Sequence, residues 1–433
     1  MSRIHRVLAA ALLLSAAAAL HANEHRYERS VNKTVRYQGG KVTIDNSFGA
    51  VDVHDGEAGE VTIHAVVRAS NEELQNAIKV EISATPAGVT IRSDFPEQIR
   101  NSSFSVSYDV AIPITAPLSV KNRFGSTTVT GTRAPVEVVS RQGSVTVHDV
   151  LGSQKVDNAF GSIDVHDVRG DLIARNANGS IHVSDVQGTT DIGNRFGSVE
   201  VSDVGRGLTL RSANGSVEVH GTRGPTIIEN SFAQIVATDI GGSLTITAQN
   251  TKVTARDERG NASITTTFAP IDVSAVHGPL AISGSNGNIT VSDIGGPLAV
   301  DTRFGLVQAS EIRGPVDIDN ENGGVTVKEV QGSAKVHTSF GSAFLKDVRG
   351  AIAVSVASPC HDTHLKTSFG SIKVEIPAGG YNVNARTSFG AVNTDLPMSN
   401  MHSTGETLNG TIGNGGCKLE LLNSNGNIAI EKQ

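Results

Sequence analysis

The densest group of reactive side chains is the run Cys360-His361-Asp362-Thr363-His364. Thiolate, imidazole and carboxylate groups are all metal ligands, so Cys360, His361, Asp362 and His364 are the candidate metal ligands of the chain. No second ligand pair stands at a diagnostic spacing from this run, and the sequence therefore favours no metal site here.

Acidic residues also recur at multiples of 18 residues, and a stack of them would need compensating charge. The column is formed by Asp149, Asp167, Asp185, Asp203, Asp239, Asp293, Glu311, Glu329 and Asp347. One interpretation is cation binding, as in calcium-loaded β-rolls, but those rolls carry several glycines and an aspartate in every nine residues. Arginines follow two residues later in several repeats, as at Arg169 and Arg313. The pattern favours turn-capping acids screened by arginine over metal sites.

Histidines are scattered, apart from His148 and His166, which share a repeat position, and His54, which has a similar Val-His-Asp context. A transition metal on such residues is the alternative to a solvated surface, which the scatter favours. The chain has no G-x-S-x-G, G-x-x-x-x-G-K-[ST] or H-E-x-x-H motif. We therefore name no catalytic residue and no cofactor.

A strict 18-residue period organises these residues. Glycines before Ser-Val, Ser-Ile and similar pairs stand at 125, 143, 161, 179, 197, 215, 287, 305, 323 and 341. A second glycine series, including Gly152, Gly170 and Gly350, follows half a period later. Between the glycines β-branched residues alternate with polar ones, which predicts two strands per unit. One unit cannot enclose a core alone, so the sequence predicts an all-β, single-chain parallel β-solenoid.

Within each unit, the alternation predicts which side chains face inward. For the unit that starts at Phe160, these are Ile163, Val165, Val168, Leu172 and Ala174. The residue before each marker glycine is in phase with them and alternates between Phe and Asn: Phe124, Phe160, Phe196, Phe232, Phe268, Phe304 and Phe340, with Asn178, Asn214, Asn250, Asn286 and Asn322. We interpret this column as a structural core ladder, with an aromatic stripe offered to a ligand as the alternative. Coils of 18 residues are favoured over coils of 36 because the turns repeat at 18.

The ends depart from this period. Residues 1–22, with two arginines before an apolar run, resemble a secretory signal peptide that is removed on export. We expect an N-terminal β cap and early coil over 23–120, regular coils over 121–350, and irregular coils and a cap over 351–433. Asn71 to Ile78 could be helical. Cys360 and Cys417 are candidates for a disulfide, although a regular stack would hold them about three coils apart, beyond disulfide reach.

The chain resembles the putative-adhesin domain family, exported bacterial β-solenoids related to the head GIN domain. The resemblance rests on Tyr108-Asp109-Val110-Ala111-Ile112-Pro113, on repeated Asn-Gly-Ser-Val units, and on Asn425-Gly426-Asn427-Ile428. It implies a fold more than an activity.

Composition narrows the function further. A formal charge of −7 with four tyrosines and no tryptophan argues against nucleic-acid binding. We expect a non-enzymatic, adhesin-like binding protein of the periplasm, cell envelope or medium, without a transmembrane anchor after signal cleavage, whose partner is a surface polysaccharide or protein. The alternatives are a carbohydrate-active β-helix enzyme, which would need long loops around a groove, and a periplasmic protein that binds a partner under envelope stress.

Overall fold

The structure is a computed structural model that describes residues 27–96, 102–357 and 360–433. The expected signal peptide at 1–22 lies outside these residues. Within the described ranges, no helix is long and apolar enough to cross a membrane. Contacts divide the chain into two compact units, Met1–Asp191 and Ile192–Gln433, and each is described by itself.

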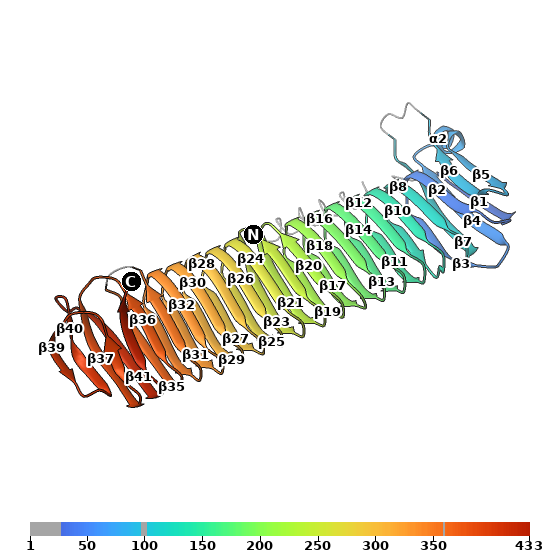
Figure 1. The fold of residues 1–433 in the computed structure, drawn as a ribbon. Helices are drawn as coiled ribbons and strands as arrows, with labels where there is room; N and C mark the ends of the chain where they lie inside the picture. The colour runs from blue at the N-terminus through green and yellow to red at the C-terminus, as the bar shows by residue number, and fades with distance from the viewer. Residues whose placement is uncertain (1–26, 97–101, 358–359) are drawn as a thin grey trace, which may run out of the picture. The chain divides into compact units, whose positions relative to one another are not determined.

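The first unit has two sheets whose strands are mainly parallel, and short corners join one sheet to the other (Figure 1). Sheet A contains β3 (Val51–Gly56), β9 (Thr127–Thr130), β11 (Val145–Val150), β13 (Ile163–Val168) and β15 (Ile181–Val186). Sheet B contains β2 (Lys41–Phe48), β8 (Leu118–Phe124), β10 (Val136–Gln142), β12 (Gln154–Phe160) and β14 (Leu172–Asn178). β16 (Thr190–Phe196) runs across the boundary between the units.

The second unit repeats this arrangement. Sheet A contains β17 (Val199–Val204), β19 (Val217–Thr222), β21 (Ala233–Ile240), β23 (Thr251–Glu258), β25 (Ile271–Val276), β27 (Ile289–Ile294), β29 (Val307–Ile312), β31 (Val325–Val330), β33 (Ala343–Val348) and β35 (Thr363–Phe369). Sheet B contains β18 (Leu208–Asn214), β20 (Thr226–Asn230), β22 (Leu244–Ala248), β24 (Ala262–Phe268), β26 (Leu280–Asn286), β28 (Leu298–Phe304), β30 (Val316–Asn322), β32 (Ala334–Phe340), β34 (Ile352–Val356) and β36 (Ile372–Ile376).

Register confirms the parallel β-solenoid and the 18-residue coil. Val145 pairs with Ile163 in sheet A, and Val156 pairs with Ala174 in sheet B, each exactly one repeat further on. The alternative of 36 residues per coil is wrong. The inward prediction for Ile163, and for its four apolar companions in that coil, is confirmed, because all five side chains are buried. Stacking lets neighbouring coils share a core that no single coil could enclose.

Glycine is required where coils stack at their corners. Gly305 has φ of +127°, and a Cβ built on it would lie 2.2 Å from the carbonyl oxygen of Gly287, one coil earlier. The marker glycines are thus a consequence of close backbone approach combined with left-handed conformation.

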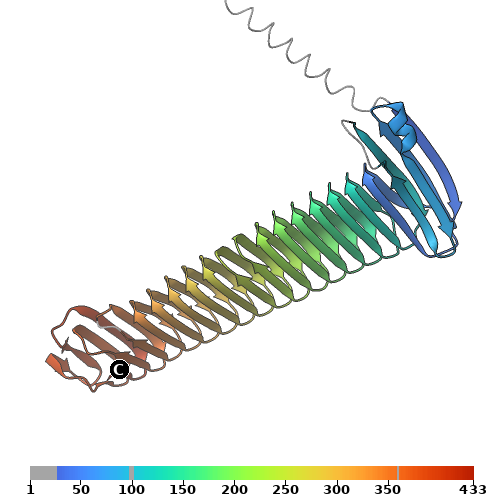
Figure 2. The ribbon, with the colours of Figure 1, turned by 90° about the horizontal axis from the view of Figure 1, so that it is seen from above.

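At the N-terminal end, the coil formed by β2 and β3 lies between strands that come later in the sequence. β2 pairs with β8, and β3 pairs with both β9 and β7 (Phe104–Pro113). β6 (Gly88–Asp94) borders β2, with β5 (Lys79–Thr85) antiparallel to it, while β4 (Glu60–Ala69) and β1 (Tyr27–Arg36) continue antiparallel from β7. α2 (Glu72–Ala77) contacts β1 and β4 (Figure 2), and Asn71 Oδ1 accepts a hydrogen bond from Leu74 N at 2.8 Å. The expected helix is confirmed.

The C-terminal end shows the same insertion. β41 (Cys417–Asn425) lies between β35 and β37 (Tyr381–Phe389), and β42 (Ile428–Lys432) lies between β36 and β38 (Val392–Thr394) (Figure 1). β40 (Thr407–Ile412) and β39 (Met398–Ser403) extend sheet A antiparallel beyond β37.

Candidate functional site

The phenylalanine column lies on the outside of the coil, so the prediction of a core ladder is wrong. The seven rings from Phe124 to Phe340 are between 39% and 59% exposed. Their asparagine partners Asn178, Asn214, Asn286 and Asn322 are half-buried, and Asn250 is exposed. We call this edge of the coil, formed by the residues immediately before the marker glycines, the aromatic corner.

The backbone turn explains the error. In β12, Gln154, Val156 and Asn158 alternate inward as expected, but Ala159 is half-buried and Phe160 exposed. The strand turns into Gly161, whose φ is +117°, so alternation stops at Asn158. Alternation along the strand would place Phe160 in the core, but the turn at the corner points its side chain outward.

The true internal corner residue stands two positions earlier and is polar. Nδ2 of Asn158 donates to Gly143 O at 3.0 Å, and Nδ2 of Asn320 donates to Gly305 O at 3.0 Å. These amides satisfy carbonyls that the corner leaves without a strand partner. The sequence analysis missed this column, although its signal is present as Asn-x-Phe-Gly and Asn-x-Asn-Gly repeats.

In the second unit, the aromatic corner forms a regular row. Register places Phe268, Asn286, Phe304, Asn322 and Phe340 on successive strands of sheet B. Successive rings are thus two strand spacings apart, about 9.6 Å. Leu306, 49% exposed, lies just past Phe304 and widens the apolar surface.

At the N-terminal end of the first unit, this column carries phenylalanine rings on two adjacent strands. Phe48 and Phe124 are register partners, and their rings stack at 4.9 Å between centroids with 3° between planes. Phe104 packs edge-on against Phe48 at 4.8 Å. This position therefore allows ring stacking wherever two rings are one strand apart.

A second short row lies at the other corner. A Cβ on Gly370 would meet the backbone of Gly350 and Ala351, so Gly370 stacks on the half-period glycine series and not on Gly341. Phe369 and Phe389, 61% and 73% exposed, both pair with Asn425, which lies between them. Sequence spacing alone did not reveal that the Phe-Gly motif changes corner after residue 350.

The acidic column marks the opposite edge, which we call the charged corner. Every position from 131 to 347 at 18-residue spacing has φ between +53° and +72°. Aspartate tolerates this left-handed conformation better than most residues, which confirms the expected turn role. Arg259 Nη2 lies 3.2 Å from Asp239 Oδ1, and Arg313 Nη2 lies 3.6 Å from Asp293 Oδ1. In the described residues, no three His, Cys, Asp or Glu side chains are grouped to hold a metal.

One carboxylic acid at the charged corner faces the core. Glu258 occupies the position held by Ile240 and Val276 in neighbouring coils and is fully buried. Neither carboxyl oxygen has a hydrogen-bond partner. Burial, with smaller contributions from Asp257 and Asp239, raises its pKa to about 8. Sequence alternation gives the signal, because Glu258 interrupts an apolar column.

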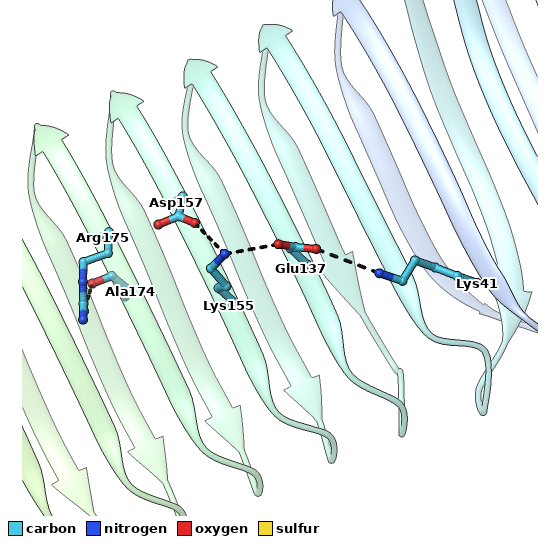
Figure 3. A network of polar contacts seen from close by, with 6 residues as sticks. All are labelled: Lys41, Glu137, Lys155, Asp157, Ala174 and Arg175. Carbon is cyan, nitrogen blue, oxygen red and sulfur yellow. Dashed lines mark hydrogen bonds and ion pairs between the residues drawn. The ribbon is translucent and has the colours of Figure 1, made fainter.

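The outer face of sheet B in the first unit carries a ladder of opposite charges (Figure 3). Lys155 Nζ lies 3.2 Å from Glu137 and 3.5 Å from Asp157, and Lys41 Nζ lies 4.0 Å from Glu137. The hydrogen bond to Glu137 contributes most to raising the pKa of Lys155. Solvent screens exposed pairs of this kind, so the ladder is a polar surface that adds little to stability.

His148, His166 and His54 each make a side-chain contact. His148 and His166 stack at 4.9 Å, and His166 Nδ1 lies 3.0 Å from Asp167 Oδ2. His54 Nε2 lies 2.9 Å from Asp109 Oδ1. Partial burial alone would lower the pKa of His54, but hydrogen bonds to Asp55 O and Asp109 raise it above its usual range.

Cys360 and Cys417 form a disulfide with Cα atoms 5.2 Å apart. The expected separation of three coils is wrong because β41 returns to lie directly beside β35. The disulfide removes Cys360 as a metal ligand. Asp362 Oδ1 accepts from Lys418 N at 2.8 Å, and His364 Nδ1 lies 2.8 Å from Glu420 Oε2. The structure does not bring Cys360, His361, Asp362 and His364 together as a ligand set.

Open depressions are shallow. One of about 290 Å³ is lined by residues of β18, β20 and β22, including Arg211, Glu229 and Asn230. Arg211 Nε pairs there with Glu229 Oε2 at 3.3 Å.

Residues 243–431 match the family model of the Toastrack domain, DUF4097. This segment is similar to the Toastrack domain. A solved structure described as a putative cell adhesion protein from Clostridium sporogenes aligns over 94% of this chain and 100% of its own, with 8% identity and a TM-score of 0.18. No curated protein matches the chain.

The segment that matches the Toastrack model, residues 243–431, contains three of the features described above. The row from Phe268 to Phe340, the buried Glu258 and the Cys360–Cys417 disulfide all lie within it. The charge ladder of Figure 3 lies outside it.

Proposed function

We propose that the chain is an exported, non-enzymatic binding protein of the cell envelope that contacts a surface polysaccharide or another protein through the aromatic corner. The observation that carries this proposal is the row of exposed phenylalanines, because soluble proteins seldom leave aligned aromatic rings in water without a partner. The match of residues 243–431 to the Toastrack model is consistent with an adhesin-like role for this chain.

The coil geometry supports binding over catalysis. From β24 to β33, each corner is short and no loop rises beside the sheets to wall a groove. A carbohydrate-active enzyme would need paired carboxylates within such a groove. A partner-binding role in the envelope stress response would use the same surface, and it differs only in the partner.

We further propose that residues 23–120 and 351–433 act as caps. Their antiparallel strands β1, β4, β39 and β40 cover strand edges that would otherwise template association.

The test is binding of residues 23–433 to a panel of envelope polysaccharides and matrix proteins, with sugar products analysed in parallel. We expect binding without cleavage, and we expect Phe304→Ser to weaken it. Ile227→Ser is the matched control, because Ile227 is an apolar residue 41% exposed on sheet B away from the corner. New reducing or unsaturated ends would make the chain an enzyme, and equal loss in both variants would remove the aromatic corner from the site.

A further inference from the structure

The aromatic corner of the second unit consists of alternating rings and gaps. Between Phe268 and Phe304, and again between Phe304 and Phe340, a half-buried asparagine forms the floor of a gap about 9.6 Å wide. A flat ring centred in the gap would be about 4.8 Å from each neighbour, within the stacking range of aromatic pairs. Each gap therefore has the size of one aromatic ring.

The protein itself shows what a filled gap looks like. Where two phenylalanines occupy adjacent strands of this column, Phe48 and Phe124 stack face to face at 4.9 Å. A ring supplied from outside would reproduce that spacing along the whole row. The partner must then present rings at a repeat of about 9.6 Å, equal to that of the row itself.

A second copy of this chain meets that requirement by construction. If a two-fold axis passes midway between a phenylalanine and the next asparagine, every ring of one copy lies over an asparagine of the other. Such an interface is closed and self-complementary. We infer that the aromatic corners of two copies pair in this way, with their phenylalanine rows interdigitated; this inference rests on the proposed binding function of that corner.

Charge favours this corner for self-contact. The chain carries a net charge of −7, so two copies repel one another overall. From 196 to 340 the aromatic corner itself holds only Phe and Asn, and the charged residues within two positions of it are Arg195, Lys252, Arg303 and Glu321. The charged corner carries acids or arginines on most coils, and a contact there would have to remove these charged groups from water.

The available area is sufficient. A phenylalanine ring buries about 150–250 Å² when fully covered, and the five rings from Phe196 to Phe340 are about half exposed. Two such rows would together bury about 1,000 Å², the lower limit for a specific interface.

Phenylalanine and asparagine also alternate on neighbouring strands where they do not alternate along the sequence. At the C-terminal end, Asn425 reaches its place between Phe369 and Phe389 only because β41 returns between β35 and β37. Ring and amide therefore alternate in space even where they do not alternate along the sequence. This second row lies at the charged corner, outside the surface that we infer to pair.

Sedimentation equilibrium of residues 23–433 over a wide concentration range tests the inference. We expect a monomer–dimer equilibrium that weakens at least tenfold in the triple variant Phe268→Ser, Phe304→Ser, Phe340→Ser. The decisive variant is Asn286→Phe with Asn322→Phe, which fills the gaps from within the chain. Interdigitation predicts that this variant also loses dimerisation at least tenfold, although it is more apolar. Ile227→Ser should dimerise as the wild type does, and thermal unfolding monitors the fold of each variant.

Tighter association of the Asn286→Phe, Asn322→Phe variant would show unspecific apolar contact and overturn the inference, as would a wild-type protein that stays monomeric. If that variant does not fold, the serine variant decides, and unchanged dimerisation there overturns the inference. A monomer that binds the polysaccharide panel through Phe304 would refute self-pairing but leave the proposed function intact. A monomer that binds nothing would refute both.

Discussion

The two corners of the coil both turn the chain from one sheet to the other, but they use different residues and point opposite neighbours inward. The aromatic corner turns through a glycine with positive φ, and the residue before it is turned outward even when it is phenylalanine. The charged corner turns through an aspartate or another residue in left-handed conformation, and the residue after it points inward. Backbone conformation, more than hydrophobicity, thus decides which side chain at a corner meets the core.

The largest expected effect lies at the inner side of the charged corner. The ordinary pKa of glutamate is 4.5, and that of buried Glu258 is about 8. The folded chain therefore holds this proton more tightly than the unfolded chain, so stability falls as pH rises from about 4.5 to 8. The shift corresponds to about 5 kcal/mol above pH 8. Glu258→Val, which matches the apolar column, should be more stable, with an advantage that grows over that pH window. Urea unfolding from pH 4 to 9 measures it, and parallel curves for the two proteins would refute the assignment.

The aromatic corner should be most sensitive at its glycines. Gly305→Ala places a Cβ 2.2 Å from Gly287 O and forces alanine to a positive φ, so we expect a loss of about 3 kcal/mol or more. Gly324→Ala is the control, because its Cβ would meet Ser342 Oγ at an ordinary 3.4 Å. Similar melting temperatures for both variants would show that the corner is more adaptable than the structure indicates.

The charged corner contains one residue that suits its conformation poorly. Ala275 has φ of +56° and lacks the side-chain oxygen with which aspartate stabilises such a turn. Ala275→Gly should stabilise the protein by about 1 kcal/mol, whereas Ala281→Gly, in strand β26, should cost about 0.5–1 kcal/mol. Chemical denaturation compares the two, and the same sign for both would contradict the difference between the corners.

The smallest effect is expected from the exposed rings. Phe196 is 44% exposed, so Phe196→Asp should change stability by less than about 1 kcal/mol. An internal ring would instead make that substitution strongly destabilising. Ile192→Asp in the same strand buries a charge at a fully buried position and should cost several kcal/mol. Thermal unfolding of the pair separates an outward from an inward column.

Alternation and period were sufficient to predict the coil, its 18-residue length and inward residues such as Ile163 and Leu172. They failed at Phe160, because alternate residues face inward only while the strand continues, and the alternation ends at Asn158. They failed again beyond Gly350, because a strand that returns between two earlier ones leaves no periodic signal in the sequence. The disulfide partners were identified, but their proximity depends on that return.

The inserted end coils have a consequence for how the stack can come apart. At the C-terminal end, β37 to β40 lie outside β41, although they precede it in the chain. Peeling away this outermost layer therefore does not release a free end. It pulls on a loop whose two ends remain tied into the stack, one of them next to the Cys360–Cys417 crosslink. A mechanical load on this layer would therefore have to open the loop while both of its ends stay paired in the stack.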